Sequence, residues 1–137
     1  MAADRNGRPD RVRILLDTNA LMMPGQFGVD IFDELLRLFG DYEPTTLTDV
    51  LRELERIARG RGKDASAARL GLQMCERCTL VSSEGMAGTV DEKVIRVAEE
   101  SGSVVVTNDR GLRNALLERG VDVIAMRGQK KLELIRG

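Results

Sequence analysis

The sequence at residues 12–19, VRILLDTN, places a carboxylate directly after a short run of aliphatic side chains. The apolar residues up to Leu16 predict a buried strand, and Asp17 stands at its carboxyl end. Residues 1–10 contain glycine, proline, asparagine and aspartate without periodicity and predict a flexible N-terminal tail. We therefore expect a single domain over residues 11–137 of the 137-residue chain.

Outward from this strand, the apolar spacing predicts helices alternating with strands. The predicted helices span residues 31–39, 47–58, 65–75, 94–100 and 112–117, and the further strands span residues 42–46, 79–81, 104–106 and 121–125. Continuous aliphatic strands separated by amphipathic helices are typical of a parallel sheet with helices on both faces. We predict an α/β fold, a three-layer α/β/α sandwich with a central, mostly parallel five-stranded sheet. Gly25 and Gly28 are expected in turns.

The composition excludes several function classes. The chain has no histidine, which excludes Ser-His-Asp hydrolysis, histidine acid-base ribonuclease chemistry and histidine-ligated zinc. Aromatic residues make up only 3% of the chain, so base stacking on aromatic side chains is an unfavourable binding mode. The sequence shows neither an apolar run of the ~20 residues that a membrane helix needs nor the apolar core of a signal peptide, and we expect a cytoplasmic protein.

Four acidic residues are candidates for a functional site, and two of them follow strands, whose carboxyl ends collect functional groups in such a fold. Asp17 directly ends the first strand and Asp109 follows the strand at 104–106 through Thr107 and Asn108, although each also suits the cap of the helix behind it. Asp91 lies on the inward face of its helix, next to a capping box predicted at residues 89–92 that does not need it. Glu53 borders the apolar stripe of its helix, a position that also suits a surface ion pair.

Convergence of these carboxylates has a chemical consequence. Repulsion of about 4 kcal/mol per close pair, at an effective dielectric constant near 20, raises their pKa values or demands a cation. Ligation by oxygen alone selects Mg²⁺ or Mn²⁺. Such an ion lowers the pKa of bound water and stabilises the leaving oxygen, so phosphodiester hydrolysis needs no histidine.

The set of motifs formed by LDTN at residues 16–19, REL at 52–54, VD at 90–91 and VTNDRGL at 106–112 resembles the PIN (PilT N-terminus) family over nearly the whole chain. The resemblance implies a metal-dependent endoribonuclease acting on single-stranded RNA. It implies that one or two Mg²⁺ or Mn²⁺ ions are held, and the attacking water activated, by Asp17, Glu53, Asp91 and Asp109. Polar support is implied for Thr18, Asn19, Thr107 and Glu92.

Within the family, residues 23–28 and 47–50 look closest to an archaeal branch related to the small-subunit ribosomal RNA processing nucleases. This likeness implies a role in rRNA processing or RNA maturation, with pre-rRNA as a candidate partner. The alternatives are a toxin-type PIN ribonuclease and a catalytically silent RNA-binding or protein-binding module. A homodimer and a protein partner, such as an antitoxin or a processing factor, stay open.

Two further features have competing interpretations. The exposed basic residues predicted at Arg56, Arg59, Arg61 and Lys63 can meet RNA phosphates or can form a solvated face. The cysteines of residues 75–78 have C-x-x-C spacing, but a structural zinc site needs four ligands, and the chain has no second pair. We expect Cys75 and Cys78 to be buried or incidental, with a disulfide or a dimer-shared metal as the alternatives.

Overall fold

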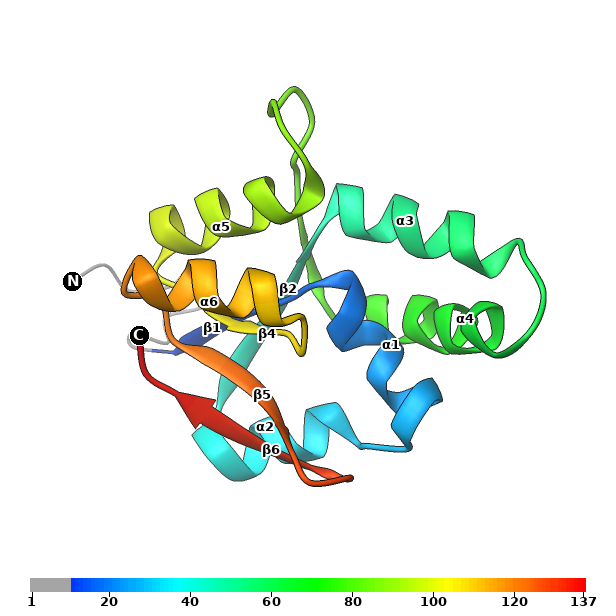
Figure 1. The fold of residues 1–137 in the computed structure, drawn as a ribbon, viewed down its shortest axis with the longest axis horizontal. Coiled ribbons are helices and arrows are strands. Elements are labelled where there is room, and N and C mark those ends of the chain that lie inside the picture. The colour runs from blue at the N-terminus through cyan, green and yellow to red at the C-terminus, as the bar shows by residue number, and fades with distance from the viewer. Residues whose placement is uncertain (1–10) are drawn as a thin grey trace.

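The computed structural model describes residues 11–137 as a six-stranded sheet between two layers of helices (Figure 1). The tail expected at residues 1–10 lies outside the described residues. The strands are β1 (Val12–Leu16), β2 (Tyr42–Leu47), β3 (Thr79–Val81), β4 (Val104–Val106), β5 (Val123–Arg127) and β6 (Lys131–Ile135). The helices are α1 (Thr18–Phe27), α2 (Ile31–Phe39), α3 (Thr48–Ala58), α4 (Lys63–Cys75), α5 (Val90–Ser101) and α6 (Arg110–Glu118).

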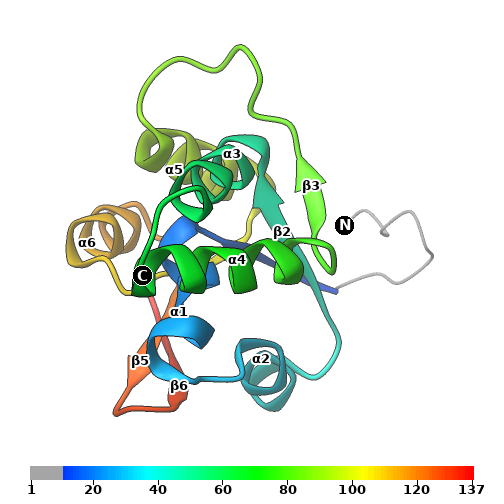
Figure 2. The same ribbon diagram turned by 90° about the vertical axis from the view of Figure 1, so that its right-hand side faces the viewer.

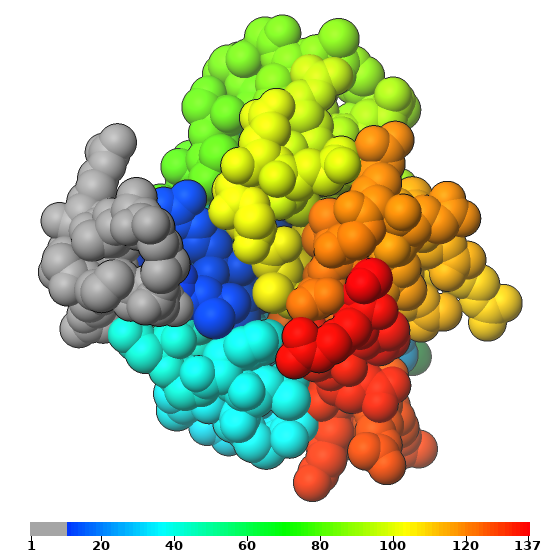
Figure 3. All heavy atoms as spheres, turned by 90° about the vertical axis from the view of Figure 1, so that its left-hand side faces the viewer, coloured from blue at the N-terminus to red at the C-terminus, as the bar shows by residue number. Residues whose placement is uncertain are grey.

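The strand order is β3-β2-β1-β4-β5-β6, with every neighbouring pair parallel except β5 and β6. Connections between parallel strands are right-handed. The face that a connecting helix covers therefore depends on the direction in which the chain moves across the sheet. The chain runs from β1 through β2 to β3 on one side, which places α1 to α4 on one face (Figure 2). It then returns to β4 and β5 on the other side, which places α5 and α6 next to each other on the opposite face (Figure 3). The predicted three-layer sandwich is confirmed.

The core consists of aliphatic side chains from the central strands and the inner faces of the helices. Ile14, Leu15 and Leu16 of β1 are fully buried, as are Val105 and Val106 of β4. A strand with helices above and below it has no solvent-facing side, which explains why β4 and the last three residues of β1 are continuously apolar. In the described part of the chain, no helix is both long and apolar enough to cross a membrane.

The predicted number of five strands is wrong, because β6 adds a sixth. Strand β6 turns back on β5 through Gly128, whose φ of 68° lies in the left-handed region that favours glycine. Helix α2 then bonds the backbone of Leu132: Arg37 donates to its carbonyl oxygen at 2.8 Å, and its N–H donates to Glu34 at 2.8 Å. These contacts are made by residues about a hundred positions apart, so no local pattern predicts them.

The prediction of a turn at Gly25 is also wrong, since Gly25 lies inside α1, a helix that the apolar spacing did not indicate. The Pro24-Gly25 pair breaks the helical pattern in the sequence, but the packing explains the glycine. A Cβ atom on Gly25 would stand 2.5 Å from the Cα atom of Ala67 in α4. Gly28, by contrast, does form a turn, as the left-handed C-cap of α1 with φ of 72°.

The two cysteines lie at the end of α4 as free, half-buried thiols. Burial raises the pKa of Cys75 to about 11 and that of Cys78 to about 12. A thiol that holds its proton is a weak nucleophile and a poor metal ligand. The structure therefore agrees with the expectation of buried or incidental cysteines.

Candidate active site

A cavity of about 230 Å³ opens at the carboxyl ends of β1 and β4, the two central strands. Four predicted site carboxylates line it together, although they come from four different segments of the chain. The lining residues are Asp17, Thr18, Asn19, Met22, Glu53, Val90, Asp91 and Asp109. The structure thus places the predicted acidic residues around one space, at the point where the strand order reverses.

Asp17 forms the floor of the cavity and is only 5% exposed. Its Oδ1 accepts a hydrogen bond of 2.7 Å from the N–H of Ala20, so it also serves as the N-cap of α1. Burial raises the pKa of Asp17 to about 7, with smaller contributions from Asp91 and Asp109, while hydrogen bonds from Thr107 and Ala20 oppose the rise. The capping role and the site role expected for Asp17 are combined in one carboxyl group.

Asp109 is held in a similar way at the end of β4. Its Oδ1 accepts from the N–H of Leu112 at 2.8 Å as the N-cap of α6, while its own N–H donates to Thr107 at 3.1 Å. Asn19 ties the two strand ends together by accepting a 2.8 Å hydrogen bond from the N–H of Asn108. The backbone that carries Asp17 and the backbone that carries Asp109 are therefore fixed relative to each other.

Glu53 and Asp91 form opposite walls of the cavity. Glu53 projects from α3 and is half-buried, whereas Asp91 projects from the first turn of α5 and is exposed. Burial, Asp109 and Glu53, in that order, raise the pKa of Asp91. The contributions of Asp109 and Glu53 arise because several negative charges face one small space.

The supporting residues that we predicted occupy different positions. Thr18 and Asn19 line the cavity, and Thr107 is fully buried next to Asp17. Glu92 is not among the lining residues, because its side chain accepts a 3.1 Å hydrogen bond from the N–H of Thr89. The N–H of Glu92 donates at 3.1 Å to the Thr89 hydroxyl, which completes the predicted capping box. The four basic residues Arg56, Arg59, Arg61 and Lys63 are all exposed around the end of α3 and the start of α4.

Two apolar residues that were not predicted from the sequence, Met22 and Val90, also line the cavity. Met22 lies one helical turn after Thr18, and Val90 is the first residue of the VD motif at 90–91. These positions are the sequence signal for them. Apolar walls beside carboxylates reduce the local dielectric constant and so strengthen the electrostatic interactions in the cavity.

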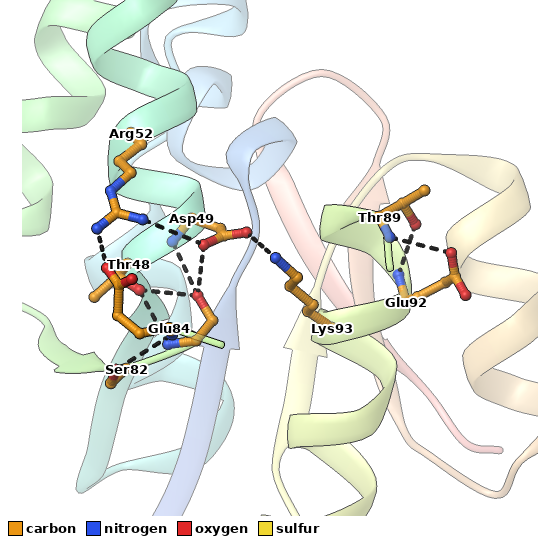
Figure 4. Close-up of polar contacts among 9 residues, drawn as sticks. Thr48, Asp49, Arg52, Ser82, Glu84, Thr89, Glu92 and Lys93 are labelled. Carbon is orange, nitrogen blue, oxygen red and sulfur yellow. Dashed lines mark hydrogen bonds and ion pairs between the residues drawn. The ribbon is translucent and has the colours of Figure 1, made fainter. Parts of the chain in front are cut away.

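A second polar network, also missed, joins α3, α5 and the loop after β3 beside the cavity (Figure 4). Asp49 accepts hydrogen bonds from Ser83 at 2.9 Å and from Lys93 at 2.5 Å. Ser83 is itself buried and shares a 2.9 Å hydrogen bond with Thr48. Arg52 bonds to Glu84 at the exposed edge of the network.

The donor set fits a hard divalent cation. Carboxylates and hydroxyls surround the cavity without any thiol or imidazole, and the Oγ1 atom of Thr18 is buried without a hydrogen-bond partner. Within residues 11–137, no three His, Cys, Asp or Glu side chains stand close enough together to hold one ion as they are. Like charges repel one another, so these carboxylates would draw closer together only if a cation offset their repulsion.

Comparison with known proteins gives a family and several relatives. The family described as "PIN like domain" matches residues 14–129. The chain is 34% identical over 134 residues to Ribonuclease VapC9 of Archaeoglobus fulgidus, covering 96% of both chains. It is 30% identical over 127 residues to Ribonuclease VapC4 of Methanocaldococcus jannaschii, covering 89% of this chain and 95% of that protein.

Among solved structures, the PIN domain endonuclease Utp24 superposes with a TM-score of 0.74. The match covers 91% of this chain and 92% of the other at 20% sequence identity. At that identity, the likeness establishes the shared fold.

Proposed function

Because the chain belongs to the PIN-like domain family, we propose that it is a metal-dependent endoribonuclease that hydrolyses phosphodiester bonds in single-stranded RNA. Ribonuclease activity is supported by the two archaeal relatives, which are named ribonucleases and match this chain almost from end to end. The proposal locates catalysis in the cavity formed by Asp17, Glu53, Asp91 and Asp109.

The observation that carries the proposal is the buried Asp17 carboxyl at the centre of an acidic cavity. With a pKa of about 7, Asp17 holds a proton at neutral pH for part of the time, because burial and its acidic neighbours disfavour its charge. A divalent cation can replace that proton and repay the cost of ionisation, so binding releases protons. The helix cap that Asp17 forms does not need a buried, acidic cavity around it, whereas metal binding does.

Asp17, Glu53, Asp91 and Asp109 would hold Mg²⁺ or Mn²⁺, with Thr18 offering its unpartnered hydroxyl oxygen. When bound, such an ion supplies a water of lowered pKa and positive charge beside the scissile phosphate. The chain itself supplies the orientation: Asn19 and the two helix caps fix the backbones of Asp17 and Asp109. Glu92, engaged in its capping box, is left out of the proposed ligand set.

RNA binding is proposed for the basic group of Arg56, Arg59, Arg61 and Lys63. Arg56 lies three residues after Glu53 and so projects from a neighbouring part of the same helix surface. All four side chains are exposed, and the group continues from the cavity wall around the end of α3. A single-stranded RNA bound along these four basic side chains would extend into the cavity.

Two classes of RNA target are candidates. Processing of ribosomal RNA is the target expected from the sequence, and the likeness to Utp24 at 20% identity bears on the fold and not on this target. A toxin-type ribonuclease, the alternative, is supported by the higher identity to the two proteins named VapC and by their matching length. We propose the toxin type as the stronger candidate, because 34% identity carries more weight than a shared fold at 20%. A protein partner that blocks the acidic cavity, or a second copy of the chain, would fit this type.

The proposal is tested by incubating labelled single-stranded RNA with the protein in Mn²⁺, in Mg²⁺ and in EDTA. We expect cleavage with either metal, none in EDTA, and a loss of at least about a hundredfold in Asp17→Asn, since removing the charge removes a metal ligand. Arg119→Gln, at the opposite end of the sheet, serves as the control and should cleave normally. Full cleavage by Asp17→Asn would refute the site, and no cleavage under any condition would favour a silent binding module.

A further inference from the structure

The two walls of the acidic cavity belong to different parts of the fold. Helix α3, which carries Glu53, packs mainly on α4, whereas α5, which carries Asp91, packs on α6 and on β1. These two helix pairs lie on opposite faces of the sheet (Figure 1), and each contributes an acidic residue to the lining of the cavity. The spacing between Glu53 and Asp91 therefore depends on contacts that join α3 to α5.

One ion pair joins these two helices beside the cavity. Lys93 of α5 reaches Asp49 of α3 with an Nζ to Oδ2 distance of 2.5 Å (Figure 4). Both side chains are largely shielded, at 13% and 17% exposure, whereas the nearby pair of Arg52 and Glu84 is 60% and 57% exposed. Exposed ion pairs contribute little, but a shielded pair with further hydrogen bonds resists separation.

The Asp49 end of the ion pair is rigidly held. Its Oδ1 accepts from Ser83 at 2.9 Å, and the buried Ser83 hydroxyl also accepts from the N–H of Asp49 at 3.1 Å. The N–H of Ser83 donates to Thr48 at 3.0 Å, which closes the network around the first turn of α3. Lys93 thus bonds to a fixed anchor rather than to a freely rotating carboxylate.

Both members stand close to proposed metal ligands along their helices. Asp49 lies four residues before Glu53, on the same side of α3, and Lys93 lies three residues after Val90, which lines the cavity. A shift of either helix at the ion pair is transmitted to the cavity wall within one turn. Neither Asp49 nor Lys93 lines the cavity itself.

We propose that Lys93 and Asp49 form a positioning pair, which holds α3 and α5 at the separation that lets Glu53 and Asp91 bind the same metal centre. The inference rests on the proposed metal-dependent function. Lys93 acts through the helices and not through contact with RNA or metal. Loss of Lys93 lets α3 and α5 move apart and thereby weakens metal binding. Removal of a positive charge near a cation site would by itself strengthen metal binding.

In a Lys93 variant, the lost positive charge and the lost link between the helices change the metal affinity in opposite directions, so the measured direction tells the two effects apart. Mn²⁺ binding to the full chain is measured by calorimetry for the natural protein, Lys93→Met, Asp49→Asn and the double variant. We expect each single variant to weaken Mn²⁺ binding by about tenfold and the double variant to be no weaker than the singles, because the pair acts as a unit. Lys93→Arg, which keeps the charge and can reach Asp49, should restore most of the affinity.

Arg52→Gln is the matched control. It removes one positive charge from the same network, where Arg52 lies 3.9 Å from Asp49, but it breaks no link to α5. Its Mn²⁺ affinity should be unchanged or slightly higher. Melting temperatures of all variants, measured without metal, establish that each is folded.

The outcomes separate this inference from the proposed function. Natural protein that binds no Mn²⁺ would overturn the metal-dependent function and the inference with it. Normal binding by the natural protein, with equal or tighter binding by Lys93→Met, would overturn the inference alone. The inference alone would also be overturned if Lys93→Met kept its Mn²⁺ affinity but had a higher KM for RNA, since Lys93 would then contact the substrate.

Discussion

In the metal-free folded protein, the Asp17 carboxyl holds a proton at pH values where an exposed carboxyl has released it. Its pKa is about 7 when folded, against the ordinary value of 3.8 that the unfolded chain restores. The folded state therefore binds more protons between these values. The contribution of Asp17 to stability is fully present below about pH 4 and is lost as the pH rises through about 7.

We therefore expect Asp17→Asn to stabilise the metal-free protein at pH 8, by up to about 4 kcal/mol at 1.36 kcal/mol per pKa unit. The asparagine oxygen can still accept the hydrogen bond from Ala20, so the helix cap is kept. Urea unfolding at pH 5 and pH 8 in EDTA measures the effect. The gain should be large at pH 8 and less than half as large at pH 5, because pH 5 lies only about one unit above the ordinary pKa of 3.8. A variant that is destabilised at both pH values would contradict the assignment of the burial cost to this carboxyl.

At the residue scale, the sequence predicted the features that depend on local position and missed those that depend on distant contacts. Asp17 and Asp109 were identified because Asp17 directly follows an apolar strand and Asp109 stands three residues after the end of another. Asp49 and Lys93 were not, because each looks like an ordinary surface charge, and 44 residues separate them. An ion pair between two helices leaves no periodic signal in either helix.

At the element scale, the contact between α1 and α4 depends on two glycines, Gly25 and Gly71. A Cβ atom on Gly71 would stand 2.7 Å from the carbonyl oxygen of Leu21, which is backbone and cannot rotate away. Alanine favours a helix over glycine by about 1 kcal/mol, but the forced separation of two packed helices costs more.

We expect Gly71→Ala to destabilise the protein by about 1–3 kcal/mol, a cost of overpacking that exceeds the gain in helix propensity. Thermal unfolding measures it. Gln73→Ala, an exposed position on the same helix, is the control and should change stability by less than about 0.5 kcal/mol. If Gly71→Ala matched or exceeded the natural protein in stability, the close approach of α1 to α4 would be disproved.

The elements that the sequence predicted are those with strong local patterns. The strands at 79–81 and 104–106 have the predicted bounds, and α3 and α4 lie within two residues of theirs. Helix α1 was missed because Pro24 and Gly25 interrupt it, and β6 because its pairing depends on the β5 hairpin and on Glu34 and Arg37 of α2. Tertiary packing decides both cases.

At the scale of the whole molecule, the basic group around the end of α3 defines a direction of approach for RNA. Replacing Arg59 and Arg61 by glutamine should reduce the salt dependence of RNA binding. The slope of log affinity against log salt should fall by about 0.7 for each phosphate that the variant no longer binds. Binding is measured in the Asp17→Asn background, which keeps the RNA intact.

Arg119 and Arg136, replaced in the same way, are the matched control because they lie by the amino ends of β4 and β5, away from the cavity. Their replacement should leave the salt slope unchanged. Equal slopes for both double variants would dismiss the proposed RNA path and leave the basic group as a solvated surface.

The order of the strands in the sheet also determines when, during synthesis of the chain, the proposed site can assemble. The central strand β1 is made first, but its neighbour on the Asp109 side, β4, consists of residues 104–106. Proteins emerge from the ribosome N-terminus first, so a chain still under synthesis has Asp17 and Glu53 long before it has Asp91 and Asp109. A protein proposed to cut RNA thus cannot assemble its site on the ribosome before β4 and Asp109 have also emerged.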